Sequence, residues 1–194
     1  MHTQILTKEV VILSPQHPPV TLDSPSQRRF SERQIRRSIL RILEGNVLCS
    51  MSTVTKDIRA HINTAYFCYC EDLELYFLSD PSSLHCRNLS TNSSMAMTIF
   101  SSSQKWTGPD RGMQLFGTCK EARGYQAMKA ERWYGNRFPQ YRQWKTGQGK
   151  DDQLRAFRYR FYRFVPGKVK ILDEREFGGG VFVTAAVRRV QDSN

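Results

Sequence analysis

Hydrophobic positions along the chain follow a helical period in the first well-patterned segment, residues 31–44. Apolar residues recur there every three or four positions, which predicts an amphipathic helix. The stripe consists of Ile35, Ile39, Ile42 and Leu43. Ser31 and Gln34 have the spacing of a capping box, so the helix is expected to begin at Ser31. Gly45 follows the stripe and is expected to end the helix in the left-handed conformation.

After this helix, apolar and polar positions alternate, which is typical of half-buried strands. Short turn-like segments separate the first three strands, so we expect these to be antiparallel. Gly117 lies inside a long strand and predicts a bulge or sharp bend. Pro166 and Gly167 predict a tight turn between two late strands. The predicted strands cover 46–54, 60–70, 73–78, 94–101, 113–122, 157–165, 168–172 and 181–190. This pattern favours a mainly β protein, a small closed antiparallel barrel with flanking helices.

The rest of the chain divides into an arm and an insertion. Residues 1–30 are rich in proline and predict an N-terminal arm, a candidate for embracing a dimer partner. Within the arm, residues 10–13 are expected either to add an edge strand or to pack on a partner. Residues 31–194 are expected to form one barrel domain. Its insertion at about 124–157 begins with a helix at 125–133 and continues as a polar, basic and aromatic connection. A short helix is also expected at 84–90, and a flexible loop at 176–180.

The net charge of +11 and the pI near 9.7 indicate an anionic partner. The excess is concentrated in residues 120–163, which hold 12 basic and 4 acidic side chains. No apolar run approaches the roughly 18 residues that span a bilayer, and no signal-peptide core is present, so we expect a cytoplasmic protein without a membrane segment. The five cysteines are an odd number without metal-ligand spacing, and they are interpreted as buried free thiols with no metal site.

The segment from Leu78 to His85 has the residues of a phosphate cradle. A strand ends, hydroxyl side chains cluster, and a helix begins, so its first turn would present unpaired amides and the positive end of the helix dipole. Ser79 and Ser83 would add hydroxyl donors, and His85 a charge. Taken alone, an ordinary helix cap is the better explanation of the same residues.

The order of three segments resembles the pyridoxamine-5′-phosphate-oxidase-like family of FMN-binding split barrels. The family's strand of the type PHVSPVWFVYD corresponds to residues 60–69, AHINTAYFCY. Its strand and helix of the type GLYFLTSPDSRKARNL correspond to 75–89, LYFLSDPSSLHCRNL, and its RGVQLEGTAE to 111–119, RGMQLFGTC. The match covers residues 46–122 and is not close to the vitamin-B6 oxidase itself.

This resemblance implies an FMN-binding oxidoreductase that transfers a hydride between flavin and a small, anionic substrate. It also implies a homodimer with flavin sites at the interface. Family positions that meet the cofactor fall on Asn63, Thr64, Ala65, Leu78, Ser79, Ser83, Leu84, His85, Trp106 and Gln114, with Trp106 shielding the ring. Tyr66, Arg158 and Arg160 are candidates for substrate binding. Tyr66, His61 and His85 are candidates for acid–base work, although His61 is interpreted first as a hydrogen-bonded strand residue.

Three positions depart from the family's pattern. The oxidases have Arg, Lys and Arg where this chain has Asn63, Cys68 and Leu84. FMN would then be held by neutral donors and by basic residues from elsewhere, or the ligand would be haem, with His85 as a possible iron ligand, or the deazaflavin F420. A second hypothesis is a non-catalytic basic module for nucleic acid, because residues 158–163 interleave arginines with aromatics. The family-like segments favour the flavoprotein.

Overall fold

A computed structural model of the chain describes residues 10–13, 30–146 and 158–189. Strands dominate, as the sequence predicts. The strands are β1 (Val10–Leu13), β2 (Leu48–Val54), β3 (Ala60–Tyr69), β4 (Leu75–Ser79), β5 (Ser94–Phe100), β6 (Arg111–Glu121), β7 (Arg160–Asp173) and β8 (Phe182–Arg189). The helices are α1 (Glu32–Glu44), α2 (Leu84–Thr91), α3 (Tyr125–Arg137), α4 (Pro139–Lys145) and α6 (Glu174–Phe177). None of the helices in these ranges is long and apolar enough to cross a membrane.

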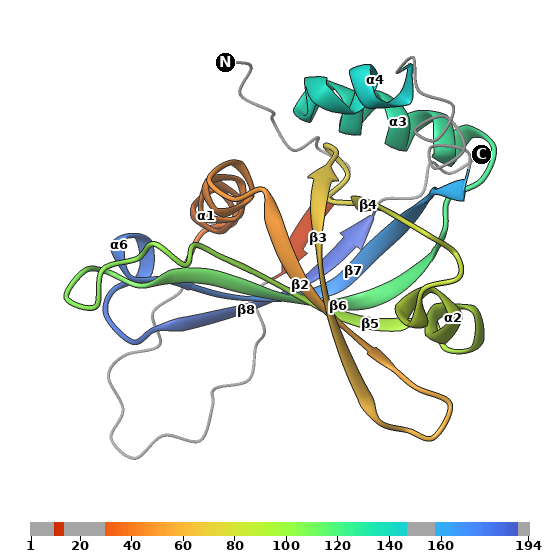
Figure 1. Cartoon of the computed structure of the whole chain (residues 1–194). Helices are drawn as coiled ribbons and strands as arrows, with labels where there is room; N and C mark the ends of the chain where they lie inside the picture. Colours follow the sequence, from red (N-terminus) through yellow and green to blue (C-terminus); the bar gives the residue numbers. More distant parts are fainter. Residues whose placement is uncertain (1–9, 14–29, 147–157, 190–194) are drawn as a thin grey trace, which may run out of the picture.

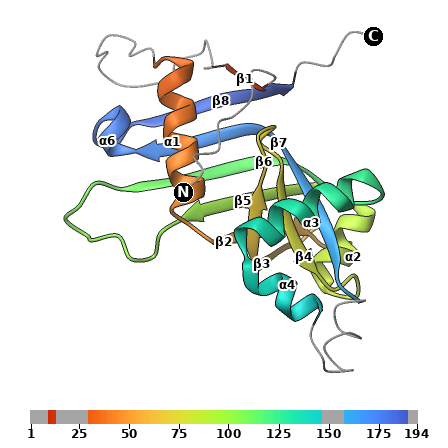
Figure 2. The same cartoon turned by 90° about the horizontal axis from the view of Figure 1, so that it is seen from above.

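Six antiparallel strands close into a barrel in the order β7-β4-β3-β2-β5-β6, and pairing between β6 and β7 completes the ring. β8 extends the sheet from β7, and β1 adds to the edge of β8 through residues 10–13, which confirms the predicted edge strand. The barrel and its flanking helices are seen from two sides in Figures 1 and 2. The fold is therefore the split barrel that the strand pattern and the family resemblance predict.

β7 corrects one prediction about the chain path. Pro166 and Gly167 were expected to form a turn between two strands, but they lie inside one continuous strand of 14 residues. The first half of β7 pairs with β4 and the second half with β8, while β6 follows it throughout. The β6–β7 register shifts between Phe116 and Gly117. The two residues therefore form part of a bulge that bends both strands, and this confirms the predicted irregularity at Gly117.

Three local predictions near helix ends also change. The capping box of α1 is present, but Gly45 is right-handed (φ −74°, ψ −6°), because its amide simply continues the helical pattern to the Arg41 carbonyl. The polar connection after α3 contains the helix α4, with proline in its first turn. The loop expected at 176–180 begins with the last residues of the short helix α6.

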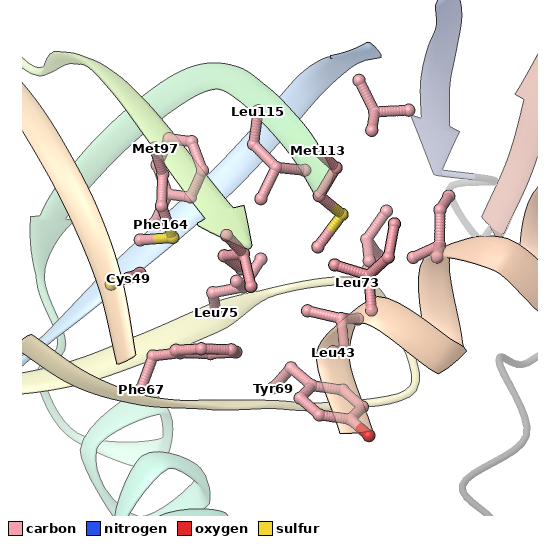
Figure 3. Packing of buried hydrophobic residues seen from close by; sticks show 14 of the residues in the cluster. Leu43, Cys49, Phe67, Tyr69, Leu73, Leu75, Met97, Met113, Leu115 and Phe164 are labelled. Atoms are coloured by element: carbon pink, nitrogen blue, oxygen red, sulfur yellow. The ribbon is translucent and has the colours of Figure 1, made fainter. Parts of the chain in front are cut away.

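Two groups of buried side chains hold the elements together. The larger fills the barrel and the contact with α1, and Figure 3 shows its packing around Phe67, Leu75 and Phe164. The smaller lies between the barrel and α3 and includes Tyr76, Ala130 and Phe161. All five cysteines are buried and free, which confirms their predicted state.

A buried ionic cluster fixes α3 to the barrel. Glu74 is 3 % exposed, accepts a hydrogen bond from the Tyr76 hydroxyl at 2.6 Å, and pairs with Arg163 of β7. Lys129 of α3 pairs with Asp72 and lies 3.3 Å from a Glu74 oxygen. Burial alone would raise the pKa of Glu74, but hydrogen bonds from Arg163 and Tyr76 and the charges of Lys129 and Arg163 outweigh it and lower the pKa to about 2. Part of the excess positive charge in residues 120–163 therefore forms ion pairs inside the fold.

Candidate functional site

A cluster of polar side chains lies where β4 ends and α2 begins. Ser79 is the last residue of β4 and is buried; its hydroxyl lies 2.7 Å from the Nε2 atom of His85. The Ser83 hydroxyl lies 3.2 Å from the same nitrogen and 3.4 Å from the Ser79 hydroxyl. The three side chains that the sequence grouped as a cradle are therefore in mutual contact.

The first turn of α2 keeps its donors available. Asp80 shapes the preceding turn by accepting from the Ser82 amide and hydroxyl at 2.8 and 2.7 Å. Ser83 is the N-cap residue, but its side chain makes no capping hydrogen bond. Within the described part of the chain, the amides of residues 84–86 have no acceptor, whereas the Arg87 amide makes the first helical bond to the Ser83 carbonyl. Free amides at a helix start favour an anion.

His85 is accompanied by a second imidazole. Its ring and that of His61 on β3 are nearly parallel, with centroids 6.4 Å apart. Burial and the neighbouring His61 both lower the pKa of His85 below its usual 6.5, so the ring is neutral at pH 7. His61 lies on β3, as the sequence predicts. Its Nδ1 atom, however, is buried without a hydrogen-bond partner among the described residues.

Two arginines border this site, Arg158 just before β7 and Arg160 as its first residue. Arg158 lies 3.0 Å from an Asp80 carboxylate oxygen, and Arg160 pairs in register with Ser79. Both arginines are exposed. Of the aromatics interleaved with the arginines, Phe161 and Tyr162 are 7 % and 5 % exposed and pack in the interior, whereas Tyr159 is 37 % exposed and contacts Trp144 edge-on. This segment therefore offers cations to the site, while two of its three aromatics are buried and not available for stacking on single-stranded nucleic acid.

The predicted contacts on the other strands lie on both faces of the sheet. Asn63 and Ala65 alternate on β3 with Thr64, which is exposed on the outer face. Gln114 on β6 is also exposed, and the pairings place it in one row with Thr64 across β2 and β5. Three strand spacings separate these two residues, which is roughly 14 Å. They share a face without touching.

The remaining predicted residues fall at the rim or elsewhere. Leu78 is half-buried beside Ser79, and Leu84 is 42 % exposed at the start of α2. Tyr66 is 55 % exposed on the outer face and packs its ring edge against Phe138, with centroids 5.6 Å apart. Trp106 is fully exposed in the β5–β6 loop. This loop lies on the opposite side of the molecule from α2 in both overall views (Figures 1 and 2). Within one chain, Trp106 does not join the cradle.

Residues 70–74 contain a second group of chemically reactive side chains. One ligand atom each from Cys70, Asp72 and Glu74 lies within 4.8 Å of the others. Lys129 and Arg163 already neutralise the two carboxylates, and burial raises the pKa of the Cys70 thiol. These contacts suit the packing of α3 rather than a cation site.

Comparison with known proteins agrees with this architecture. The sequence profile described as "Pyridoxamine 5'-phosphate oxidase" matches residues 35–177. No curated protein matches the sequence. A heme binding protein from Mycobacterium smegmatis superposes with a TM-score of 0.62 at 12 % identity, covering 82 % of this chain and 59 % of that one.

Two further solved structures share the fold. A putative pyridoxamine 5'-phosphate oxidase from Listeria innocua has a TM-score of 0.54 at 19 % identity, over 73 % of this chain and 98 % of that one. The heme storage protein HutZ from Vibrio cholerae has a TM-score of 0.53 at 13 % identity, over 67 % of this chain and 88 % of that one. Identities this low establish the fold alone.

Proposed function

Because the chain belongs to the pyridoxamine 5′-phosphate oxidase family, we propose that it binds FMN and transfers a hydride to or from a small anionic substrate. The observation that carries the proposal is the meeting of Ser79, Ser83 and His85 at the start of α2. FMN, when bound, supplies the hydride chemistry, and the protein supplies binding, orientation and electrostatics.

The donors of this site fit a phosphate group. The hydroxyls of Ser79 and Ser83 can turn their protons toward an anion, and the neutral His85 ring can donate from Nε2. The free amides of the first turn of α2 add donors that need no side-chain movement. In this arrangement the phosphate would displace the contacts that the three side chains now make with each other.

The positive charge for such a phosphate would come from β7. Asn63 and Leu84 are neutral where the family has arginine, and the cation in the first turn of α2, Arg87, donates to the Ser82 carbonyl. Arg158 and Arg160 lie at the same end of the barrel, and Arg158 can exchange the Asp80 carboxylate for a phosphate oxygen. We assign Asn63, Thr64 and Gln114 to the flavin ring on the family's pattern.

The functional unit in this proposal is a homodimer. The outer face of the barrel exposes Leu48, Ile62 and Tyr66 at 49 %, 73 % and 55 %, and Leu48 lies directly opposite Tyr66 in the β2–β3 ladder. A second copy of the chain would cover this apolar surface. Sedimentation velocity of Ile62→Glu should show a shift toward monomer, whereas Met128→Glu on α3, also strongly exposed, should leave the assembly unchanged.

The absorption spectrum of the purified protein tests the flavin proposal. Adding FMN should give perturbed flavin bands and quenched flavin fluorescence at micromolar concentrations. Ser83→Ala should weaken FMN binding about 10-fold or more, because a hydrogen bond to a charged group contributes roughly 1.5–3 kcal/mol. Ser90→Ala, at the other end of the same helix, is the matched control and should bind like the wild type.

Three results would count against the proposal. The first is FMN fluorescence and absorption that stay unchanged on adding the protein. The second is equal FMN affinity in Ser83→Ala and Ser90→Ala. The third is a Soret band on adding hemin together with no response to FMN, which would identify the chain as a haem-binding protein instead.

A further inference from the structure

A pocket of about 290 Å³ lies far from α2, on the side of the molecule where α1 ends. The C-terminal end of α1, the loop after β5 and the helix α6 meet there, and Figures 1 and 2 show these elements opposite α2. The lining residues are Arg41, Gly45, Asn46, Ser101, Gln104, Lys105, Gly108, Pro109, Arg111 and Arg175. The pocket has the volume of a small ligand site.

Four of the lining residues are cationic and none is acidic. Beneath them, the fully buried Asp173 accepts a hydrogen bond from Ser38 at 2.8 Å and lies 3.4 Å from both Arg41 and Arg111. One buried carboxylate thus orients two guanidinium groups toward the same space. Arg41 also lies 3.6 Å from a Glu176 carboxylate oxygen, and the donors of both arginines that these contacts do not use remain for a ligand.

The other two cations, Lys105 and Arg175, have no side-chain partner in the described ranges. Their backbones are nevertheless well held. The Asp110 amide donates to the Glu174 carboxylate at 3.0 Å, and the Glu174 amide donates to the Asp110 carbonyl at 3.1 Å. These two bonds tie the β5–β6 loop to α6, so Lys105 and Arg175 extend from connected segments.

The loop is also ordered internally. The Gln104 side chain donates to the Ser101 carbonyl at 3.0 Å and accepts from the Arg111 amide at 2.6 Å. The Gly108 amide donates to the Lys105 carbonyl at 2.9 Å. The four cationic side chains therefore line a pocket whose walls are hydrogen-bonded backbone. A ligand would have to order little of the surrounding chain when it binds.

We propose that this pocket binds the phosphoryl group of a small phosphorylated molecule, at a site separate from the cradle at α2. Planar guanidinium groups match the paired oxygens of a phosphate, and the buried Asp173 fixes the orientation of two of them. Lys105 and Arg175 widen the cationic surface beyond one phosphoryl group, so a diphosphate should bind more tightly than a monophosphate. The site does not depend on flavin binding.

Titration calorimetry of the full-length protein with inorganic pyrophosphate and inorganic phosphate tests the proposal. We expect pyrophosphate to bind more tightly than phosphate, and the double variant Lys105→Gln/Arg175→Gln to bind pyrophosphate at least tenfold more weakly. The control Lys56→Gln/Arg132→Gln removes the same charge from exposed residues elsewhere and should bind like the wild type.

Each opposite result overturns the proposal. Absence of pyrophosphate binding at millimolar concentration removes the site, and equal losses in the two double variants reduce it to general charge attraction. Loss of pyrophosphate binding in Ser83→Ala alone would place the anion at α2. A parallel loss of FMN affinity in Lys105→Gln/Arg175→Gln would make the pocket part of the flavin site, whereas unchanged FMN affinity supports two sites.

Discussion

Replacing Glu74 with glutamine should lower the free energy of unfolding by about 3 kcal/mol at pH 7. The substitution keeps the volume of the side chain and its ability to accept from Tyr76, but removes the charge. Arg163 and Lys129 then remain in the partly buried contact with only Asp72 to balance them. Leaving one half of a buried ion pair typically costs about 3–5 kcal/mol.

The pKa of Glu74 gives the same magnitude independently. Burial disfavours the carboxylate, but the hydrogen bonds and charges of its partners lower the pKa from 4.5 to about 2. At about 1.4 kcal/mol for each pKa unit, ionised Glu74 contributes about 3 kcal/mol to the folded state. Because the folded-state pKa is the lower one, this contribution is present above pH 4.5 and is lost as the pH falls toward 2.

Urea unfolding followed by far-ultraviolet circular dichroism at pH 7, 5, 4 and 3 measures both effects. The difference between wild type and Glu74→Gln should be about 3 kcal/mol at pH 7 and should shrink below pH 4.5. Glu71→Gln changes an exposed carboxylate in the adjacent turn and should stay within about 0.5 kcal/mol of the wild type. A difference below 1 kcal/mol at pH 7, or one that stays constant with pH, would refute the reasoning.

Three other outcomes follow from local geometry. Ser31→Ala removes the capping box of α1 and should destabilise the protein by about 1 kcal/mol in urea, with an unchanged midpoint contradicting the cap assignment. A Cβ atom at Gly117 would lie 2.1 Å from the Val165 carbonyl oxygen, so Gly117→Ala should lower the melting temperature strongly, whereas Gly179→Ala in an open loop should not. Burial raises the pKa of Cys49 to about 12 and covers the other four thiols. Ellman's reagent at pH 8 should therefore label no cysteine before unfolding and five after it. Rapid labelling of the native protein would instead show that the barrel opens readily.

Local periodicity explains why most elements could be predicted from the sequence. The capping box at Ser31 and the stripe that follows it define α1, and short turns between alternating segments define β2, β3 and β4 as antiparallel neighbours. The contact of Ser79 with His85 was predictable too, because both lie within seven residues around one strand–helix junction. Interactions over short sequence distances depend on few conformational choices.

Other features depend on partners that are distant in sequence. Pro166 and Gly167 look like a turn in isolation, and only the pairing of β7 with β4, β6 and β8 keeps them in one strand. The cationic pocket unites Arg41, Lys105 and Arg175 from three separated segments, and no local motif marks any of them. The buried ion pairs of Glu74 could not be predicted from the sequence either, because its three basic neighbours lie on α3, β7 and β8. They are Lys129, Arg163 and Arg189.

The position of β7 determines when the barrel can form during synthesis. β4 and β6 are the two strands that β7 joins, so a nascent chain that ends before residue 160 has an open sheet with two unpaired edges. Closure pairs Leu75 with Phe164, 89 positions apart, and such distant contacts form slowly. The synthesis of β7 therefore controls how long the earlier strands stay open to pairing with other chains.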